Sequence, residues 1–487
     1  MRKLTGLIVL CFSLLPISSA ANSEFQQWMQ QQNTDFQAYK DERDKAFTAF
    51  LKDNWKEMQL LKGISRDSKP KPVTIPVAKP EPVVIPKTAP VKLPDEPVAI
   101  LPSPVKPIAP IVKKPVTRVP SYKGRKASIR FMGETVTLYY DSQLRTRVAS
   151  RMSKKTISDT WSQLSKADYE PLMEQLSALR KQKNLNDWAF ALLVNEVSGA
   201  INGANKNSIA FLNWFLLIKA NYEARIAYDE RSLYLLLPTR QPLYSVSYFT
   251  FDGIRFYYVS FDGDDKKLGS VYTYDGRYPD ANEPFDMRLI SDMTNLQQTQ
   301  VRRLNFTYEG KEYAVNANYD KARIDFLNTY PQLDLDIYYR SNIASNSAAS
   351  LHEQLAVLIK DMSQQDAVNF LLRFVQTSLD YKTDEDQFGK ENYLFPEETL
   401  HYKYSDCEDR SILFAWLVRN LLGLNVVGLD YPGHVAAAVA FTVPVTGDVV
   451  SYKGKQYSVT DPTYINANAG MTMPQYNNVT PKVIEIN

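Results

Sequence analysis

A dense run of prolines divides this chain of 487 residues and constrains its fold more than any other feature. Residues 68–120 hold 15 of the 28 prolines, in runs such as KPKPVTIPVAKPEPVVIP. Proline lacks a backbone N–H and fixes φ, so neither a helix nor a central strand can form across such a run. We therefore assign residues 67–122 to an extended linker, which at about 3.1 Å per residue could reach on the order of 150 Å.

The first 21 residues, MRKLTGLIVLCFSLLPISSAA, have the parts of a secretory signal peptide. A basic start precedes a short apolar run, and small residues precede a cleavage point near Ala20 or Ala21. The apolar run is shorter than the roughly 20 residues of a membrane span. We expect residues 1–21 to be removed and the protein to be periplasmic or secreted, with no transmembrane span in the mature chain.

Residues 22–66 are polar, rich in glutamine and free of proline. Their aromatic and apolar residues recur mostly at spacings of three, four and seven, which predicts an amphipathic helical segment with an aromatic stripe. A short coiled coil or a helical hairpin would bury that stripe within the segment. Alternatively, the stripe would dock on an envelope partner or a membrane surface.

Composition excludes several classes of protein. The chain carries 57 Lys and Arg against 54 Asp and Glu, a net charge of +3 that gives no reason to expect nucleic acid as a partner. Two cysteines and three histidines are too few for a disulfide scaffold or for a zinc site built from several Cys or His. Loss of Cys11 with the signal peptide leaves Cys407 as the one cysteine of the mature chain. We expect no metal and no cofactor.

Residues 123–345 and 346–487 are expected to form two folded α+β units. In the first unit, strand-like runs such as YSVSYFTFDGIRFYYVSF surround tight turn signals, and helical stretches cover roughly 157–180 and 186–221. In the second unit, a helix of about 350–381 comes first, and a long apolar run and further strands follow it.

Cys407 lies in the sequence YSDCEDRS, directly before the apolar run 412–422. Ser405 or Asp406 is a suitable N-cap, and two acidic residues follow the cysteine, where they suit the helix dipole. We therefore expect Cys407 at or near a helix N-terminus, where exposed N–H groups favour thiolate over thiol. The neighbouring acids oppose this effect, so the cysteine needs a histidine nearby.

Two further residues complete a set that could carry out nucleophilic catalysis. His434, in YPGHVAAAVAF, follows a Pro-Gly turn and begins a strand of small residues, and Asp461, in SVTDPTY, ends a later strand. A cysteine on a helix, a histidine on a strand and an acid on the next strand supply a nucleophile, a base and an orienting group. Cys407 would attack an acyl carbon, His434 would accept the thiol proton, and Asp461 would fix the imidazole tautomer.

The stretch from about Phe395 to Tyr464 resembles the transglutaminase-like superfamily, which shares a papain-like Cys-His-Asp architecture. The matching motifs are YSDCEDRS, GHVAAAV and DPTY, within about 70 of the 487 residues. The resemblance implies a catalytic domain over residues 346–487, with the cysteine at a helix N-terminus and the histidine and aspartate on antiparallel strands. It implies the superfamily and not the reaction, because the superfamily includes cross-linkers, proteases, amidases and inactive members.

These motifs do not identify both hydrogen-bond donors of the oxyanion hole. Papain-like enzymes often place a glutamine a few residues before the cysteine, whereas His401 and Tyr402 occupy that region here. We expect the backbone N–H of Cys407 to be one donor. Tyr404, or Gln387 further upstream, is the candidate for the second donor.

The middle domain contains a sequence that parallels the region around Cys407. When NKNSIAFLNWFLLIKANYEARIAY is set against CEDRSILFAWLVRNLLGLNVVGL with Trp214 at Trp416, Asn205 falls at the position of Cys407. This parallel predicts that residues 185–260 are a degenerate duplicate of the catalytic core. The alternative is a coincidence between two buried helices that lead into strands.

Together these features predict an exported thiol enzyme that forms a thioester. The first interpretation is a cysteine peptidase or amidase that acts on a peptide or protein of the cell envelope. A cross-linking transglutaminase would resolve the thioester with an amine instead of water, which depends on how well the site excludes water. A non-catalytic tethered binding or scaffold protein is the third interpretation, because the aromatic helix and the long linker suit that role equally well.

Overall fold

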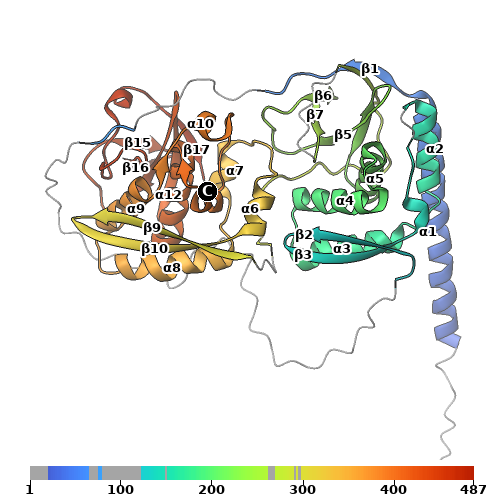
Figure 1. The fold of residues 1–487 in the computed structure, drawn as a ribbon, viewed down its shortest axis with the longest axis horizontal. Coiled ribbons are helices and arrows are strands. Elements are labelled where there is room, and N and C mark those ends of the chain that lie inside the picture. The colour runs from blue at the N-terminus through green and yellow to red at the C-terminus, as the bar shows by residue number, and fades with distance from the viewer. Residues whose placement is uncertain are drawn as a thin grey trace, which may run out of the picture.

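The computed structural model describes residues 20–64, 75–78, 122–148, 151–261, 269–289, 292–293 and 298–486. The signal peptide expected over residues 1–21 and most of the linker expected over 67–122 therefore lie outside the described residues. The described chain is a mixed α+β protein with two lobes that lie side by side (Figure 1).

The N-terminal lobe combines five helices with a large sheet and a separate hairpin. Its elements are α1 (Ala20–Asp53), β1 (Lys56–Gln59), β2 (Arg125–Phe131), β3 (Glu134–Tyr140), η1 (Ser142–Leu144), α2 (Lys154–Leu164), α3 (Glu170–Lys183), α4 (Asp187–Asn202), α5 (Lys206–Lys219), β4 (Arg225–Tyr228), β5 (Leu233–Pro238), β6 (Tyr248–Phe251), β7 (Ile254–Val259) and β8 (Ser270–Thr273). The sheet is antiparallel and has the strand order β1-β8-β4-β5-β7-β6.

The C-terminal lobe also has a hairpin, a set of helices and an antiparallel sheet. Its elements are β9 (Thr299–Tyr308), β10 (Lys311–Asp320), α6 (Lys321–Leu327), α7 (Leu335–Arg340), α8 (Ser345–Ile359), α9 (Gln364–Ser378), β11 (Asp380–Tyr381), α10 (Asp384–Phe388), α11 (Pro396–His401), β12 (Tyr404–Ser405), α12 (Cys407–Leu422), β13 (Asn425–Tyr431), β14 (His434–Ala440), β15 (Val449–Tyr452), β16 (Lys455–Thr460), η2 (Pro474–Tyr476) and β17 (Lys482–Glu485). The sheet order is β15-β16-β14-β13-β17.

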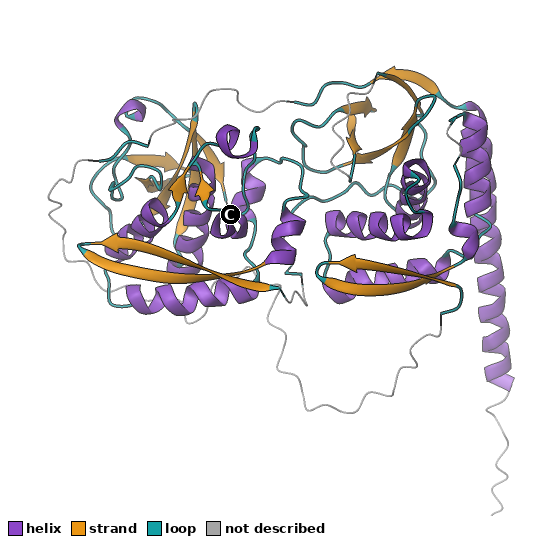
Figure 2. Ribbon diagram, in the orientation of Figure 1, coloured by secondary structure: helices purple, strands orange, loops and turns teal. Residues whose placement is uncertain are grey.

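The two lobes repeat one arrangement of elements. In each lobe a hairpin packs on two helices, the second of these packs on a buried helix, and that helix packs on the sheet (Figure 2). These elements are β2–β3, α3, α4 and α5 in one lobe and β9–β10, α8, α9 and α12 in the other. The strands that follow the buried helix also share one order, β6-β7-β5-β4-β8 and β15-β16-β14-β13-β17. The shared order supports a duplication that extends beyond residues 185–260.

Two of the helical stretches predicted from the apolar periodicity are each divided into two helices in the structure. The helix expected over 350–381 is two helices, α8 and α9, because Ser363 caps a new helix by accepting a hydrogen bond from the N–H of Asp366 at 3.1 Å. The stretch 186–221 is likewise two helices, α4 and α5, separated at Gly203, whose φ of 65° suits a glycine. The hairpin β9–β10 packs on α8 and α9 and so belongs with the C-terminal lobe, although the sequence placed it within 123–345.

The N-terminal segment is a single helix followed by a strand, and not a helical segment throughout residues 22–66. The C-terminal part of α1 packs on α2 and buries Phe47 and Leu51, and β1 joins the N-terminal sheet beside β8. Lys219 of α5 also binds the carboxylate of Asp44 at 2.7 and 2.8 Å. The other part of α1 projects beyond the lobe, and Trp28 there is 56% exposed (Figure 1).

One short part of the proline-rich segment contacts the C-terminal lobe. Val77 forms a parallel bridge with Ile465, and the N–H of Ala78 donates to the carbonyl of Ile465 at 2.8 Å. Ala78 is buried against Tyr464 and Met473. Among the described helices, none is both long enough and apolar enough to span a bilayer.

Candidate active site

The start of α12 is held in place by a buried arginine. Helix α12 lies in the centre of the C-terminal lobe, with all but one of its side chains buried. The guanidinium of Arg410 donates to Ser405 Oγ at 3.2 Å and to the carbonyls of Gln376 at 3.3 Å and Leu379 at 2.7 Å. Burial lowers the pKa of Arg410 to about 10. These bonds fix the first turn of α12 to the end of α9.

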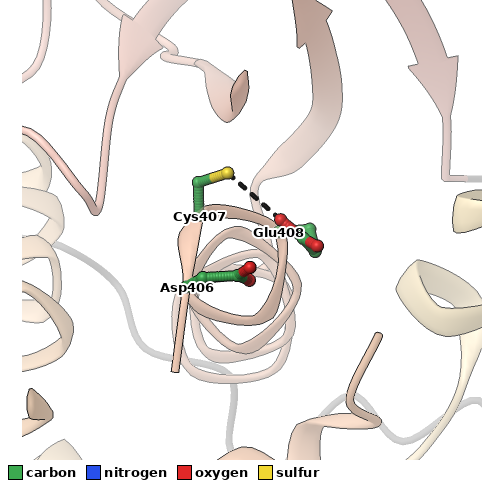
Figure 3. Close-up of side chains that lie close together, drawn as sticks. All are labelled: Asp406, Cys407 and Glu408. Carbon is green, nitrogen blue, oxygen red and sulfur yellow. Dashed lines mark hydrogen bonds between the residues drawn. The ribbon is translucent and has the colours of Figure 1, made fainter. Parts of the chain in front are cut away.

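Cys407 is the first residue of α12, as the sequence predicts, and Asp406 is its N-cap. Its side chain is fully buried and takes no part in a disulfide. The thiol Sγ donates a hydrogen bond to Glu408 Oε2 at 3.1 Å, and Figure 3 shows these two side chains turned toward one another. The backbone N–H of the first residue of a helix has no acceptor within the helix, so it can serve a ligand.

His434 and Asp461 form a buried pair at one end of the sheet. His434 is the first residue of β14, and its Nε2 lies 2.8 Å from Asp461 Oδ2. Asp461 follows β16, and its Oδ1 accepts hydrogen bonds from the N–H groups of Thr463 at 2.9 Å and Tyr464 at 3.2 Å. Each side chain of the pair is no more than 3% exposed. The other ring nitrogen of His434, Nδ1, is buried and has no hydrogen-bond partner among the described residues.

The contact between α12 and β14 brings the start of the helix beside the start of the strand. Ser411 lies one turn along α12 from Cys407, and its Oγ donates to the carbonyl of Val435 at 3.0 Å, one residue after His434. The ring of Tyr476 stacks on the imidazole of His434, with 5.2 Å between ring centres. Burial raises the pKa of Tyr476, and electrostatic interaction with Cys407 and Asp461 raises it further. Tyr476 therefore lies against the imidazole of the His434–Asp461 pair.

The candidates for the second oxyanion donor lie on elements that precede α12. The ring of Tyr404, on β12, lies 4.9 Å from the ammonium of Lys403 and 5.5 Å from that of Lys382. Gln387 lies on α10, where its N–H donates to the carbonyl of Thr383 at 3.0 Å. Both remain predictions, since these contacts do not direct either side chain to the thiol.

A group of buried acidic side chains beside Cys407 is a feature that the sequence analysis missed. Within the described residues, three sets place their ligand atoms within 4.8 Å of one another: Asp406, Cys407 and Glu408; Asp384, Asp406 and Asp409; and Asp384, Glu391 and Glu408. Carboxylates so arranged could hold a hard cation such as Ca²⁺. Glu408 and Asp409 are visible in the sequence only as acids of a first helical turn, because α10 and the loop after it meet them through tertiary packing.

The candidate site thus consists of the Cys407 thiol at the start of α12, the buried His434–Asp461 pair and the ring of Tyr476, which stacks on the imidazole. Comparison with protein-family models, with curated proteins and with solved structures gave no match to this chain.

Proposed function

We propose that the C-terminal lobe is a thiol-dependent acyl-transfer enzyme, and that it hydrolyses a peptide or amide bond in the cell envelope. Cys407 is the nucleophile, His434 the base and Asp461 the orienting acid. The observation that carries this proposal is the buried His434–Asp461 pair, whose second ring nitrogen is unpaired beside the helix that begins at Cys407. The proposal includes export, because the expected signal peptide would place the enzyme in the periplasm or outside the cell.

The hydrogen bond to Asp461 assigns the roles of the two imidazole nitrogens. If Nε2–H donates to the carboxylate, Nδ1 is the basic nitrogen and can accept the thiol proton. The thiolate would then attack the substrate carbonyl, and the backbone N–H of Cys407 would donate to the oxyanion. The protonated imidazole would return its proton to the leaving amine as the C–N bond breaks. Water would then attack the thioester, release the acid and regenerate the thiol.

The arrangement of the lobe supports a papain-like core. A buried helix with the cysteine at its start packs on an antiparallel sheet, and the histidine and aspartate lie at neighbouring strand ends of that sheet. This is the order that the resemblance to the transglutaminase-like superfamily implies. The buried His434–Asp461 pair and the thiol at the helix start support catalysis more directly than the strand order does, because one fold can host many functions.

One observation favours a non-catalytic alternative. The thiol donates its hydrogen bond to Glu408 and not to His434, and the side chains of Cys407, His434 and Asp461 are closed off from solvent. In the enzyme this arrangement is a closed resting form. A substrate must open it before the thiol can break its hydrogen bond to Glu408 and form one to His434. In a scaffold protein the same arrangement would be permanent.

Alkylation of the thiol separates these two functions. Iodoacetamide should modify Cys407 in the folded mature protein, and His434→Ala should slow the modification, because the imidazole no longer accepts the proton. His352→Ala, on α8, is the matched control and should leave the rate unchanged. Mass spectrometry of the protein incubated with envelope peptides should then find an acyl adduct on Cys407. Equal alkylation in all three proteins, with no adduct, would rule out the enzyme.

A further inference from the structure

The N-terminal lobe has a cavity at the place that corresponds to the candidate active site. In the C-terminal lobe the first residue pair between β14 and β16 is Ala437 with Thr460, and in the N-terminal lobe the first pair between β5 and β7 is Leu235 with Val259. When Ala437 is aligned with Leu235 and Thr460 with Val259, strands β14 and β16 correspond to β5 and β7.

This register assigns counterparts to the three catalytic residues. Ser232 corresponds to His434, and Ser260 corresponds to Asp461. At the helix start, Asn205 caps α5 through a hydrogen bond from the N–H of Ser208, and Lys206 is the first helical residue. At these positions the N-terminal lobe therefore lacks the thiol, the imidazole and the carboxylate that the proposed chemistry needs.

The N-terminal lobe nevertheless has an open space at the place where those three groups would lie. A cavity of about 550 Å³ is lined by Lys206, Ser232 and Ser260, together with residues of β2 and α4. Such a volume suits a small ligand of a few residues. In the C-terminal lobe, by contrast, Cys407 and His434 are almost wholly buried.

One buried group points to a ligand. Asn213, on α5, lines the cavity and is 98% buried, and its Nδ2 donates to Asn195 Oδ1 at 2.8 Å. Its own Oδ1 has no hydrogen-bond partner among the described residues. A buried acceptor left in this state destabilises the protein, and a donor on a ligand would remove that cost. A backbone amide N–H is such a donor.

The charged and apolar residues that line the cavity indicate which class of ligand it can bind. Arg130 and Lys206 supply two cations against the single carboxylate of Glu196, so the wall favours an anion. Ile129 and Phe261 supply apolar surface for side chains. An amide donor, a carboxylate and apolar side chains occur together in a short peptide with a free C-terminus.

We propose that this cavity is a non-catalytic peptide-binding site, which receives a short peptide with its free carboxylate toward Arg130 and Lys206 and a backbone N–H toward Asn213. The site would recognise material of the class that the C-terminal lobe is proposed to cleave. Binding does not need a reactive thiol, so the proposal goes beyond the enzyme function and does not depend on it.

Gly199 offers a way to fill the cavity without disturbing the fold. It lies on α4 and lines the cavity, and a Cβ added there meets no atom within 4 Å. Gly199→Leu should therefore place its side chain in the cavity, while Gly199→Ala should leave most of the space open. Both changes should preserve or raise the melting temperature, because glycine is a poor helix former.

The experiment uses the full mature chain carrying Cys407→Ser, so that turnover cannot consume the probe. The probe is a pool of N-acetylated tripeptides, with either a free or an amidated C-terminus, whose binding is detected by saturation-transfer NMR and measured by calorimetry. We expect the free acids to bind about tenfold more tightly than the amides, equivalent to about 1.4 kcal/mol, because the carboxylate makes charge-assisted bonds. Arg130→Gln should remove that preference, and Gly199→Leu should abolish binding while Gly199→Ala retains it.

Three results would overturn the proposal. The first is no binding at about 1 mM peptide, the weak end of specific recognition. The second is equal binding by Gly199→Leu and Gly199→Ala, which would place the peptide elsewhere. The third is binding of a chito-oligosaccharide that Gly199→Leu blocks, with no binding of peptides, which would assign the cavity to a sugar. None of these results bears on alkylation or acylation of Cys407, so the proposed enzyme function stands or falls separately.

Discussion

The two lobes share a topology but differ at the start of their buried helices. In the N-terminal lobe α4 leads almost directly into α5, and a cavity opens beside the start of α5. In the C-terminal lobe β11, α10, α11 and β12 intervene between α9 and α12. This inserted segment packs on the start of α12: the N–H of Leu394 donates to Asp409 Oδ1 at 2.8 Å, and Asp384 lies beside Asp406. One arrangement of elements therefore leaves the helix start beside an open cavity in the N-terminal lobe and covers it in the C-terminal lobe.

The largest expected difference between the lobes is chemical. His434→Ala should lower the rate of acyl-enzyme formation by about three orders of magnitude, because general base catalysis is lost. Ser232→Ala, at the corresponding place in the other lobe, should leave that rate unchanged. Mass spectrometry of the acyl adduct over time measures both variants. If Ser232→Ala slows acylation as much as His434→Ala does, the two sites are not independent and the comparison fails.

The next difference concerns how each helix start is anchored. Arg410→Met should lower the free energy of unfolding by about 3 kcal/mol, because it leaves Ser405 Oγ and the carbonyls of Gln376 and Leu379 unpaired in the core.

In the N-terminal lobe, Ser208 anchors the start of α5 with fewer bonds: its Oγ donates to the carbonyl of Thr146 at 3.1 Å and accepts from the N–H of Val148 at 3.0 Å. Ser208→Ala should cost about 1–2 kcal/mol. Urea unfolding of both variants gives the two values. A larger loss for Ser208→Ala than for Arg410→Met would show that the N-terminal lobe, and not the C-terminal one, depends more on the anchor of its buried helix.

The inserted segment should make stability depend on pH. Burial raises the pKa of Glu398, on α11, to about 8 from 4.5, and the neighbouring charge of Glu397 adds to the increase. The folded protein therefore holds a proton that the unfolded chain loses above about pH 4.5, so stability falls as the pH rises from there to about 8. We expect this group to lower the free energy of unfolding by about 2–3 kcal/mol between about pH 5 and pH 8.

Glu398→Gln tests this dependence, because its amide oxygen can still accept the hydrogen bond from the N–H of Phe395. The variant should be more stable than the parent at about pH 8 and about equal to it at pH 5, and the pH profile should flatten. Glu385→Gln, at an exposed position of α10, should leave the profile unchanged. An unaltered profile in Glu398→Gln would mean that Glu398 is ionised in the folded protein.

The sequence predicts the local features of the site better than its surroundings. A capping residue, an apolar run and a Pro-Gly turn are local signals, and they place Cys407 and His434 correctly at the start of α12 and β14. The parallel between Trp214 and Trp416 places both residues on buried helices, but Asn205 is the cap of α5 whereas Cys407 is the first residue of α12.

Features that depend on contacts between distant segments could not be predicted in this way. The acidic group around Asp384 and the cover of His434 by Tyr476 each join residues whose proximity only the tertiary fold decides. The cavity of the N-terminal lobe is similar, since five separate segments line it and no motif marks them. Local patterns therefore identify which residues act, while packing decides whether a substrate can reach them.

The smallest expected effect concerns access to the closed site. Tyr476 is partly exposed, and its ring covers the imidazole of His434. Tyr476→Ala should open a path to the thiol and raise the rate at which iodoacetamide modifies Cys407 by about tenfold, equivalent to about 1.4 kcal/mol in the cost of opening.

Tyr476→Phe keeps the ring and should leave the rate of alkylation near that of the parent. If both variants react at the parental rate, the barrier to access lies in the inserted segment and not in the aromatic cover. In that case the contrast between the lobes comes from the residues between α9 and α12 alone. If Tyr476→Ala reacts faster while its melting temperature is unchanged, the aromatic cover is the second element that distinguishes the covered helix start of the C-terminal lobe from the open one of the N-terminal lobe.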